Sequence, residues 1–250
     1  MPVHYLRTSD IAKAVGVHPN TVRLYEEWGL LPSIPRTSSG YRQFTEFHLE
    51  QMRLARLAFS GPWHGRRIRK SIVAVVKHSA SGDVAGARDM AGKHLALVRA
   101  ERAQAEAAAD FLERWAAGKA VEPILTPLQI GAAARLLDVT TDRLRNWERN
   151  GLINVPRGPA NGYRRYGAAE IGRLRVIRLL RSAGYSTMAI LRMILYFDRG
   201  QRDGLRQALD TPRPDEDIIF AADRWLSTLT ETEEQALNII AQLDKMLRQF

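Results

Sequence analysis

The chain has 250 residues, 45% of them hydrophobic, no cysteine and a formal net charge of +10. A chain of this length can bury more than one small core, and the lack of cysteine excludes disulfides, thiolate metal sites and thiol switches. No secretory signal is evident, and the longest aliphatic run, Ile72–Val76, is too short to span a bilayer. We therefore expect a cytoplasmic protein that does not enter the membrane.

The positive charge is concentrated in two segments. Residues 1–80 carry 12 Lys and Arg against 5 Asp and Glu, a net charge of +7, and residues 126–200 carry 13 against 5, a net charge of +8. Residues 81–125 and 201–250 have net charges of −1 and −4. Because basic fields attract polyanions, nucleic acid is the expected partner, with an acidic lipid surface as the competitor.

The two basic segments are copies of each other. Residues 6–57 align with residues 128–179 at a constant shift of 122 positions without a gap. The aligned pairs include Arg23 with Arg145, Glu26 with Glu148, Gly29-Leu30 with Gly151-Leu152, and Gly40-Tyr41-Arg42 with Gly162-Tyr163-Arg164. A repeat of this length is a small domain, so the chain is a tandem duplication.

Each copy is predicted to open with two short helices joined by a tight turn. The first helices are expected at 8–15 and 128–137, capped by Thr8 and Thr126. Pro19 suits the first turn of the second helix in copy one, and Thr140 caps its equivalent in copy two. Gly29 and Gly151 are the C-terminal stops of these second helices. Helix, turn, helix is the layout in which the second helix enters the major groove.

A basic hairpin is expected to follow each pair of helices. Residues 31–44 and 153–166 read as β-hairpins with Ser39-Gly40 and Asn161-Gly162 at their tips, and a basic hairpin beside a recognition helix is a wing. Further helices are expected at 45–60, 64–78, 167–183 and 187–197, the first of them capped near Thr45.

Two long helices are predicted at 83–117 and 216–249, because apolar residues recur there at alternating spacings of three and four. The capping-box spacing of Thr230–Glu233 favours a break in the second. The expected seam of the first helix is Ala91, Leu95, Val98, Arg102, Ala105, Ala109, Leu112 and Ala116. That of the second is Ile219, Ala222, Leu226, Leu229, Glu233, Ala236, Ile240, Leu243, Leu247 and Phe250.

Arg102 and Glu233 set the register that we predict for these helices. Antiparallel pairing within one chain places the two side chains opposite each other and sets large side chains against small ones. This favours a monomeric pseudo-dimer over a homodimer. The expected domains are 1–80, the first winged helix-turn-helix; 81–125, a long coiled-coil helix and linker; 126–200, the second winged helix-turn-helix; and 201–250, the C-terminal coiled-coil helix.

Residues 21–31 and 39–44 resemble the signature of the MerR (mercury-resistance regulator) family, and residues 145–153 and 161–166 repeat the resemblance. It implies a mostly α fold with two winged helix-turn-helix domains and long helices that pair as an antiparallel coiled coil. It also implies a transcriptional regulator that binds and distorts double-stranded DNA, with RNA polymerase as a second candidate partner. The metal-binding cysteines of the founding members are absent, and Leu24 and Asn146 replace an aromatic residue of the family's recognition helix.

The candidate DNA-binding residues lie on the recognition helices, the wings and the start of the fourth helix. Arg and Asn side chains suit base edges, whereas Thr and Lys mostly bind phosphate. Tyr41 and Tyr163 either contact the DNA backbone or pack under the wing, and Glu26 and Glu148 are expected to orient a neighbouring arginine. The set is Asn20, Thr21, Arg23, Arg36, Tyr41, Arg42, Arg66, Arg67, Arg143, Arg145, Arg149, Arg157, Tyr163, Arg164 and Arg165.

Other functional classes find less support in the sequence. No nucleophile–base pair, phosphate loop or metal cluster is evident, and the six histidines lack ligand spacing, so neither an enzyme nor a cofactor is expected. The alternative to a regulator is an architectural or recombination-accessory protein that bends DNA. A protein-interaction scaffold would show neutral recognition faces, which this chain lacks.

Overall fold

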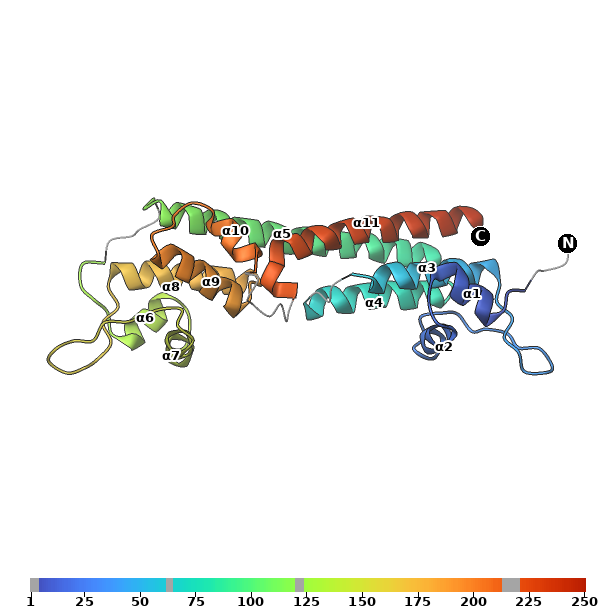
Figure 1. The fold of residues 1–250 in the computed structure, drawn as a ribbon, viewed down its shortest axis with the longest axis horizontal. Coiled ribbons are helices and arrows are strands. Elements are labelled where there is room, and N and C mark those ends of the chain that lie inside the picture. The colour runs from blue at the N-terminus through green and yellow to red at the C-terminus, as the bar shows by residue number, and fades with distance from the viewer. Residues whose placement is uncertain (1–4, 62–64, 120–123, 213–220) are drawn as a thin grey trace. The chain divides into compact units, whose positions relative to one another are not determined.

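A computed structural model describes residues 5–61, 65–119, 124–212 and 221–250, with only the backbone at 221 and 222. Within these ranges the chain is mostly helical (Figure 1). The helices are α1 (Thr8–Val15), α2 (Pro19–Glu27), α3 (Glu46–Phe59), α4 (Arg66–Ala80), α5 (Val84–Ala116), α6 (Ile130–Leu136), α7 (Thr141–Arg149), α8 (Ala168–Ser182), α9 (Thr187–Asp198), α10 (Leu205–Asp210) and α11 (Trp225–Gln249), with the 3₁₀ helix η1 (Ala221–Arg224) before α11.

The chain divides into two compact units. Unit 1 comprises Met1–Ala100 and Leu229–Phe250, and unit 2 comprises Glu101–Thr228. Each unit holds one copy of the repeat together with parts of both long helices, α5 and α11. The helices of the two copies begin and end within a few residues of the predicted positions.

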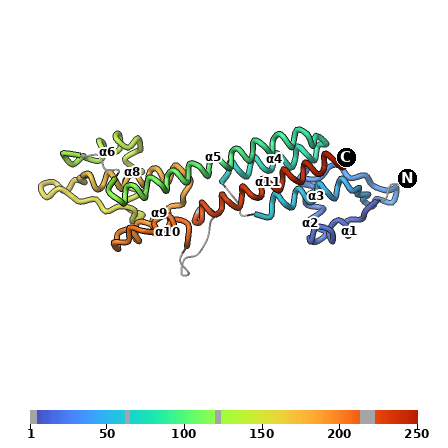
Figure 2. The backbone as a smooth tube through the Cα atoms, turned by 90° about the horizontal axis from the view of Figure 1, so that it is seen from above, coloured from blue at the N-terminus to red at the C-terminus, as the bar shows by residue number. Residues whose placement is uncertain are grey.

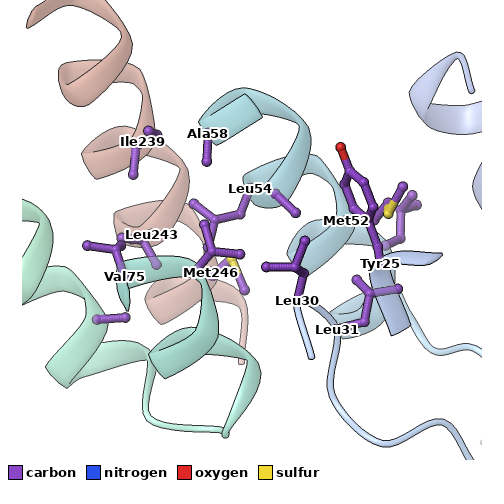
Figure 3. Close-up of a cluster of buried hydrophobic side chains, with 14 of the residues drawn as sticks. Tyr25, Leu30, Leu31, Met52, Leu54, Ala58, Val75, Ile239, Leu243 and Met246 are labelled. Carbon is purple, nitrogen blue, oxygen red and sulfur yellow. The ribbon is translucent and has the colours of Figure 1, made fainter. Parts of the chain in front are cut away.

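The core of unit 1 forms where α3, α4 and the last turns of α11 meet. Leu54, Val75 and Leu243 are fully buried there, and Figure 3 shows them converging from these three helices. The first part of α5 adds Ala87 and Ala91 to the same cluster. Full burial of one such large aliphatic side chain contributes about 1.5–3 kcal/mol. The C-terminal part of α11 is therefore an integral part of the first copy's core.

Gln51 of α3 holds neighbouring segments of unit 1 together through hydrogen bonds. Buried Gln51 donates to the carbonyl oxygens of Leu30 (2.9 Å) and Val76 (3.0 Å), and its own oxygen accepts from the Ser79 hydroxyl (2.7 Å). Both the amide nitrogen and the amide oxygen of Gln51 are thus used, and they join the segment that follows α2 to α4.

Glu50 ties α3 to α11. Its buried carboxylate receives hydrogen bonds from Gln242 (2.7 Å) and Lys245 (2.8 Å), and it also pairs with Arg53. Burial alone raises the pKa of Glu50, but these donors and the positive charges of Arg53 and Lys245 outweigh burial, so its pKa lies below its ordinary value.

Ion pairs connect the two long helices within unit 1. Arg88 of α5 pairs with Asp244 of α11 (Nε–Oδ1 2.7 Å), and Arg99 pairs with Glu233 (Nε–Oε1 2.8 Å). The lower-numbered arginine of α5 thus pairs with the higher-numbered acid of α11, and the reverse holds for the second pair. The two segments lie side by side in both views of this unit (Figures 1 and 2).

The core of unit 2 is built around two aromatic side chains with polar tips. Buried Tyr185 donates its hydroxyl to the Ala105 carbonyl of α5 (3.1 Å), and Trp225, at the start of α11, donates its indole N–H to the Ala183 carbonyl (2.8 Å). Burial followed by the negative charge of Asp210 raises the pKa of Tyr185 well above its ordinary value. Each ring buries apolar surface while its polar atom is satisfied.

A segment between α9 and α11 in unit 2 has no counterpart in copy one, where α4 ends at Ala80 and α5 begins at Val84. Its helix α10 packs on α9 and η1, and the buried guanidinium of Arg192 donates to the carbonyls of Ala208 (3.1 Å) and Leu209 (3.3 Å). The sequence predicted only a long helix from 216. Residues 213–220 lie outside the described ranges, and α11 begins at Trp225.

Several sequence predictions are corrected by the structure. Arg7 and Gln129, rather than Thr8 and Thr126, precede the first helices, and α11 runs through Thr230 without a break. The hairpins contain only isolated antiparallel bridges, not strands, because the prolines and glycines of these segments interrupt the ladder.

The buried face of α11 differs from the predicted seam. The side chains that are buried at alternating spacings of four and three are Trp225, Leu229, Thr232, Ala236, Ile239, Leu243 and Met246. Leu247 and Phe250 are exposed (43% and 59%), and Ile219 and Ala222 lie outside the described side chains. The apolar residues of α11 cover more of its surface than a single seam needs, so the sequence is compatible with two neighbouring seams. On α5, His94 is buried and Leu95 only half-buried.

Candidate nucleic-acid interface

The turn between the first two helices is the same in both copies. Gly16 (φ 67°) follows α1, and Asp138 (φ 50°) occupies the equivalent position after α6. Aspartate is among the few non-glycine residues that tolerate this left-handed conformation. In copy two the predicted cap is confirmed, since the Thr140 hydroxyl accepts from the backbone N–H of Arg143 (3.2 Å). The second helices, α2 and α7, are the ones that the sequence predicts as recognition helices, and they keep that name below.

An exposed arginine in the middle of each recognition helix is held by a residue one turn earlier. In α2 the Arg23 Nη1 donates to Asn20 Oδ1 (3.1 Å), and in α7 the Arg145 Nη1 donates to Asp142 Oδ1 (2.6 Å). The partner is a neutral amide in copy one and a carboxylate in copy two. The two arginines therefore lie in different local electrostatic environments, although their positions in the two copies are equivalent.

A glutamate near the end of each recognition helix holds two arginines of the wing. In copy one, Glu26 accepts from Arg42 Nε (2.6 Å) and lies 3.7 Å from Arg36 Nη2.

In copy two, Glu148 accepts from Arg164 Nε (2.5 Å) and lies 3.8 Å from Arg157 Nη2. We call this arrangement the wing clamp, which consists of Glu26, Arg36 and Arg42 in copy one and Glu148, Arg157 and Arg164 in copy two. An isolated antiparallel bridge joins the two arginines of each clamp.

The wing clamp joins the recognition helix to the wing in a fixed geometry. Only a fifth of each glutamate side chain is exposed, whereas Arg36 and Arg157 are about half-exposed. Each guanidinium has five N–H donors, so pairing with one carboxylate leaves donors to serve an anion. The expectation that Glu26 and Glu148 orient an arginine agrees with this arrangement.

The wing aromatics separate into an exposed and a buried pair. Tyr41 and Tyr163 are 74% and 64% exposed, which leaves their hydroxyls accessible and disfavours packing under the wing. Phe44 and Tyr166 are fully buried. The Tyr166 hydroxyl has no hydrogen-bond partner among the described residues, and burial followed by the charge of Glu148 raises its pKa. Arg165, which precedes Tyr166 in the chain, is exposed.

Four basic residues crowd the start of α4. The exposed side chains of Arg66, Arg67, Arg69 and Lys70 lie in or next to its first turn, which has no acidic residue. Cations at a helix N-terminus oppose the macrodipole, so this placement costs stability unless an anion binds nearby. The equivalent helix of copy two, α9, has no such run.

Further arginines gather beside α7 that sequence reasoning did not select. Arg178 and Arg181 of α8 line a hollow of about 750 Å³ together with Arg143 and Arg149 of α7. The sequence signal that could have identified them is the i, i+3 spacing of Arg178 and Arg181, which places both on one face of the last turns of α8. Among the described residues, no group of three or more metal-ligating side chains occurs, and no described helix is long and apolar enough to cross a membrane.

Both copies are similar to one known family. Residues 7–44 match the family described as "MerR family regulatory protein", and residues 128–196 match "MerR HTH family regulatory protein". No solved structure matches the chain.

Three curated relatives show the extent of the similarity. A "Probable heavy metal-dependent transcriptional regulator" of Haemophilus influenzae is 33% identical over 75 residues, which is 30% of this chain and 59% of the relative. The "HTH-type transcriptional regulator CueR" of Escherichia coli is 40% identical over 53 residues (21% and 39%), and the "Transcriptional regulator BrlR" of Pseudomonas aeruginosa is 34% identical over 121 residues (48% and 40%). The matched regions thus span about two-fifths to three-fifths of these relatives.

Proposed function

This chain is a MerR-family protein with two MerR-type regions, and from that premise we propose that it is a sequence-specific DNA-binding transcriptional regulator that acts as a single-chain pseudo-dimer. In this proposal one chain places α2 and α7 in successive major grooves of a promoter. The wings bind the flanking phosphates and distort the DNA between the half-sites. Double-stranded DNA and RNA polymerase are the partners, and no catalytic step is involved.

The duplicated wing clamp is the observation that carries the proposal. The same glutamate and two arginines recur in both copies, and equivalent contacts agree within 0.1 Å. A solvated basic surface does not require a largely buried carboxylate that fixes one arginine from each side of the wing. Contacts to phosphate require donors at fixed positions, because they set the register of a protein on the duplex.

The long helices support one chain in place of two. Both α5 and α11 contribute to each unit, and the ion pairs of Arg88 with Asp244 and Arg99 with Glu233 run in opposite senses. We propose that the two helices form one antiparallel coiled coil in which Arg102 and Glu233 set the register. A helix of 33 residues is about 50 Å long, enough to separate two recognition helices by one turn of DNA, about 34–36 Å.

The two half-sites are proposed to differ in sequence. Asn20 of α2 is replaced by Asp142 in α7. An amide both donates to and accepts from base edges, whereas a carboxylate only accepts, as from the amino group of cytosine. Distortion of the intervening DNA costs a few kcal/mol, which the contacts of two wings can offset.

Arginine substitutions test this function directly. Duplex DNA is first selected in vitro by the purified chain, and binding of Arg23→Ala and Arg145→Ala is then compared on selected and random DNA. Each substitution is expected to weaken binding to the selected site by about 1–3 kcal/mol and to relax specificity in its own half-site. Arg114→Gln, an exposed position of α5, is the control for loss of one charge.

Two outcomes would contradict the proposal. An equal loss on selected and random DNA would show that the arginine is not a base reader. Selection that yields only salt-sensitive, sequence-blind binding would favour the architectural DNA-bending role instead.

A further inference from the structure

The hollow beside α7 concentrates positive charge that the rest of its lining does not neutralise. Arg143, Arg149 and Arg181 line it together with Asp142 and Asp138. Both acids are already engaged, because Asp142 pairs with Arg145 (2.6 Å) and Asp138 pairs with Arg178 (3.5 Å). Among the described residues, no carboxylate pairs with Arg143, Arg149 or Arg181.

Arg181 is the residue that the fold holds in place. Its Nη1 donates to the Tyr185 carbonyl, which anchors the guanidinium at the end of α8. Partial burial lowers the pKa of Arg181, and the neighbouring charge of Arg143 lowers it further. Two like charges are thus kept close together without an internal counterion, an arrangement that a bound anion relieves.

Copy one lacks this arrangement at the same positions. Thr21, Glu27 and Phe59 stand where copy two has Arg143, Arg149 and Arg181. There the Phe59 ring packs edge-on against Tyr25 of the recognition helix (centroids 6.1 Å apart), and Tyr25 also stacks on Trp28. The two copies therefore share the helices, but copy two has three cations where copy one has a threonine, an acid and an aromatic residue.

We propose that Arg143, Arg149 and Arg181 form a phosphate-binding site, present in the second copy alone, that takes a phosphodiester of double-helical DNA beside α7. The site rests on the proposed DNA-binding function and assigns the two copies different phosphate anchors. The first copy uses the basic start of α4, and the second uses this hollow.

The lining favours a DNA phosphate over a free nucleotide. A nucleotide pocket needs an apolar or aromatic face for the base. Trp147 is the one aromatic residue in the lining, and only 4% of it is exposed, so it offers no ring face for stacking. The same recognition helix carries exposed Arg145, so a groove-bound α7 brings the backbone of the duplex to its flanks.

The salt dependence of DNA binding tests the site. Affinities of the full chain, Arg143→Thr and Arg181→Gln are measured on selected and random duplexes between 50 and 200 mM salt, with Arg114→Gln as the charge-matched control. Each hollow variant is expected to weaken binding equally on both duplexes and to reduce the salt slope by about one. Over that salt range, the wild-type affinity then falls about 3.5-fold more than that of either variant.

The outcomes separate the site from the function. If the wild type binds DNA and both variants keep its affinity and slope, the site is overturned; if the wild type itself shows no salt-sensitive DNA binding, the proposed function fails first. Arg143→Thr guards against misfolding, because its exposed side chain has no structural hydrogen bond among those described, unlike that of Arg181. Calorimetric binding of adenosine monophosphate that Arg181→Gln abolishes, with an unchanged DNA slope, would assign the hollow to a free nucleotide and overturn the DNA assignment.

Discussion

Replacement of Glu148 by glutamine tests whether the wing clamp positions the wing arginines or merely neutralises them. The change keeps the shape of the side chain and removes one negative charge. Glu148 and Arg164 are 18% and 27% exposed, so the pair lies between a surface ion pair, worth about 0–1 kcal/mol, and a buried pair, whose disruption costs about 3–5 kcal/mol. We expect Glu148→Gln to lower the free energy of unfolding by about 1–2 kcal/mol.

Two opposing effects on DNA binding follow from the same change. Loss of a carboxylate removes repulsion from the phosphates, about 0.4 kcal/mol for charges about 10 Å apart in water. Loss of the clamp releases Arg164 and Arg157, and a tenfold loss of affinity corresponds to about 1.4 kcal/mol. The loss of about 1–2 kcal/mol expected from breaking the clamp exceeds the gain of about 0.4 kcal/mol from the removed repulsion. Glu148→Gln is therefore expected to weaken DNA binding roughly five- to thirtyfold.

The assay is a double-mutant cycle on DNA affinity with Glu148→Gln, Arg164→Gln and the double variant. A coupling of about 1 kcal/mol or more is expected, since the two side chains act as a unit. The pKa of buried Tyr166 gives an independent reading of charge removal, because Glu148 raises it and the nearby arginines lower it, so it falls in the variant. If the tyrosine pKa falls while DNA affinity is unchanged or increases, the positioning role is refuted.

Three further predictions concern stability. Tyr166→Phe leaves the free energy of unfolding in urea unchanged or raises it, by up to about 1 kcal/mol, because the buried hydroxyl has no described partner; a clear loss would reveal a hidden hydrogen bond. Burial lowers the pKa of His94 to about 4, below its unfolded value near 6.5, so its protonation favours the unfolded chain and stability falls by up to about 1.4 kcal/mol per pH unit as pH drops from 6.5 to 4. Urea unfolding of His94→Leu should show a weaker decline over that range, and an unchanged decline would contradict this. Gly184→Ala should destabilise more than Gly200→Ala in thermal melts: both glycines have positive φ, but only at Gly184 would a Cβ lie within 3 Å of the Trp225 indole, so equal losses would show that the indole yields freely.

The helices and the repeat were predictable because they depend on local patterns. Capping residues, prolines and glycine stops placed α1, α2 and their copies, and Thr140 was correctly identified as a cap. The caps at Thr8 and Thr126 were wrong: Arg7 and Gln129 occupy the N-cap positions, and capping signals place the start of a helix only to within a few residues. The Arg102–Glu233 register stays a prediction; the structure pairs Glu233 with Arg99 and Arg102 with Glu106.

The site was predictable in its residue types and less so in its contacts. Glu26 and Glu148 were recognised as structural, but a pattern of charges does not show that one carboxylate holds two arginines of a wing. The hollow depends on Arg181, which lies 38 residues beyond Arg143 and becomes its neighbour only through folding. Helix α10 was missed because its six residues are too few for periodicity to reveal.

The stoichiometry of the complex on a selected duplex tests the central claim most directly. Sedimentation of the purified chain with that duplex, combined with footprinting, counts the chains per site and locates the protected half-sites. One chain that protects two unlike half-sites about one helical turn apart is the predicted result. Two chains on a symmetric site would contradict the single-chain pseudo-dimer.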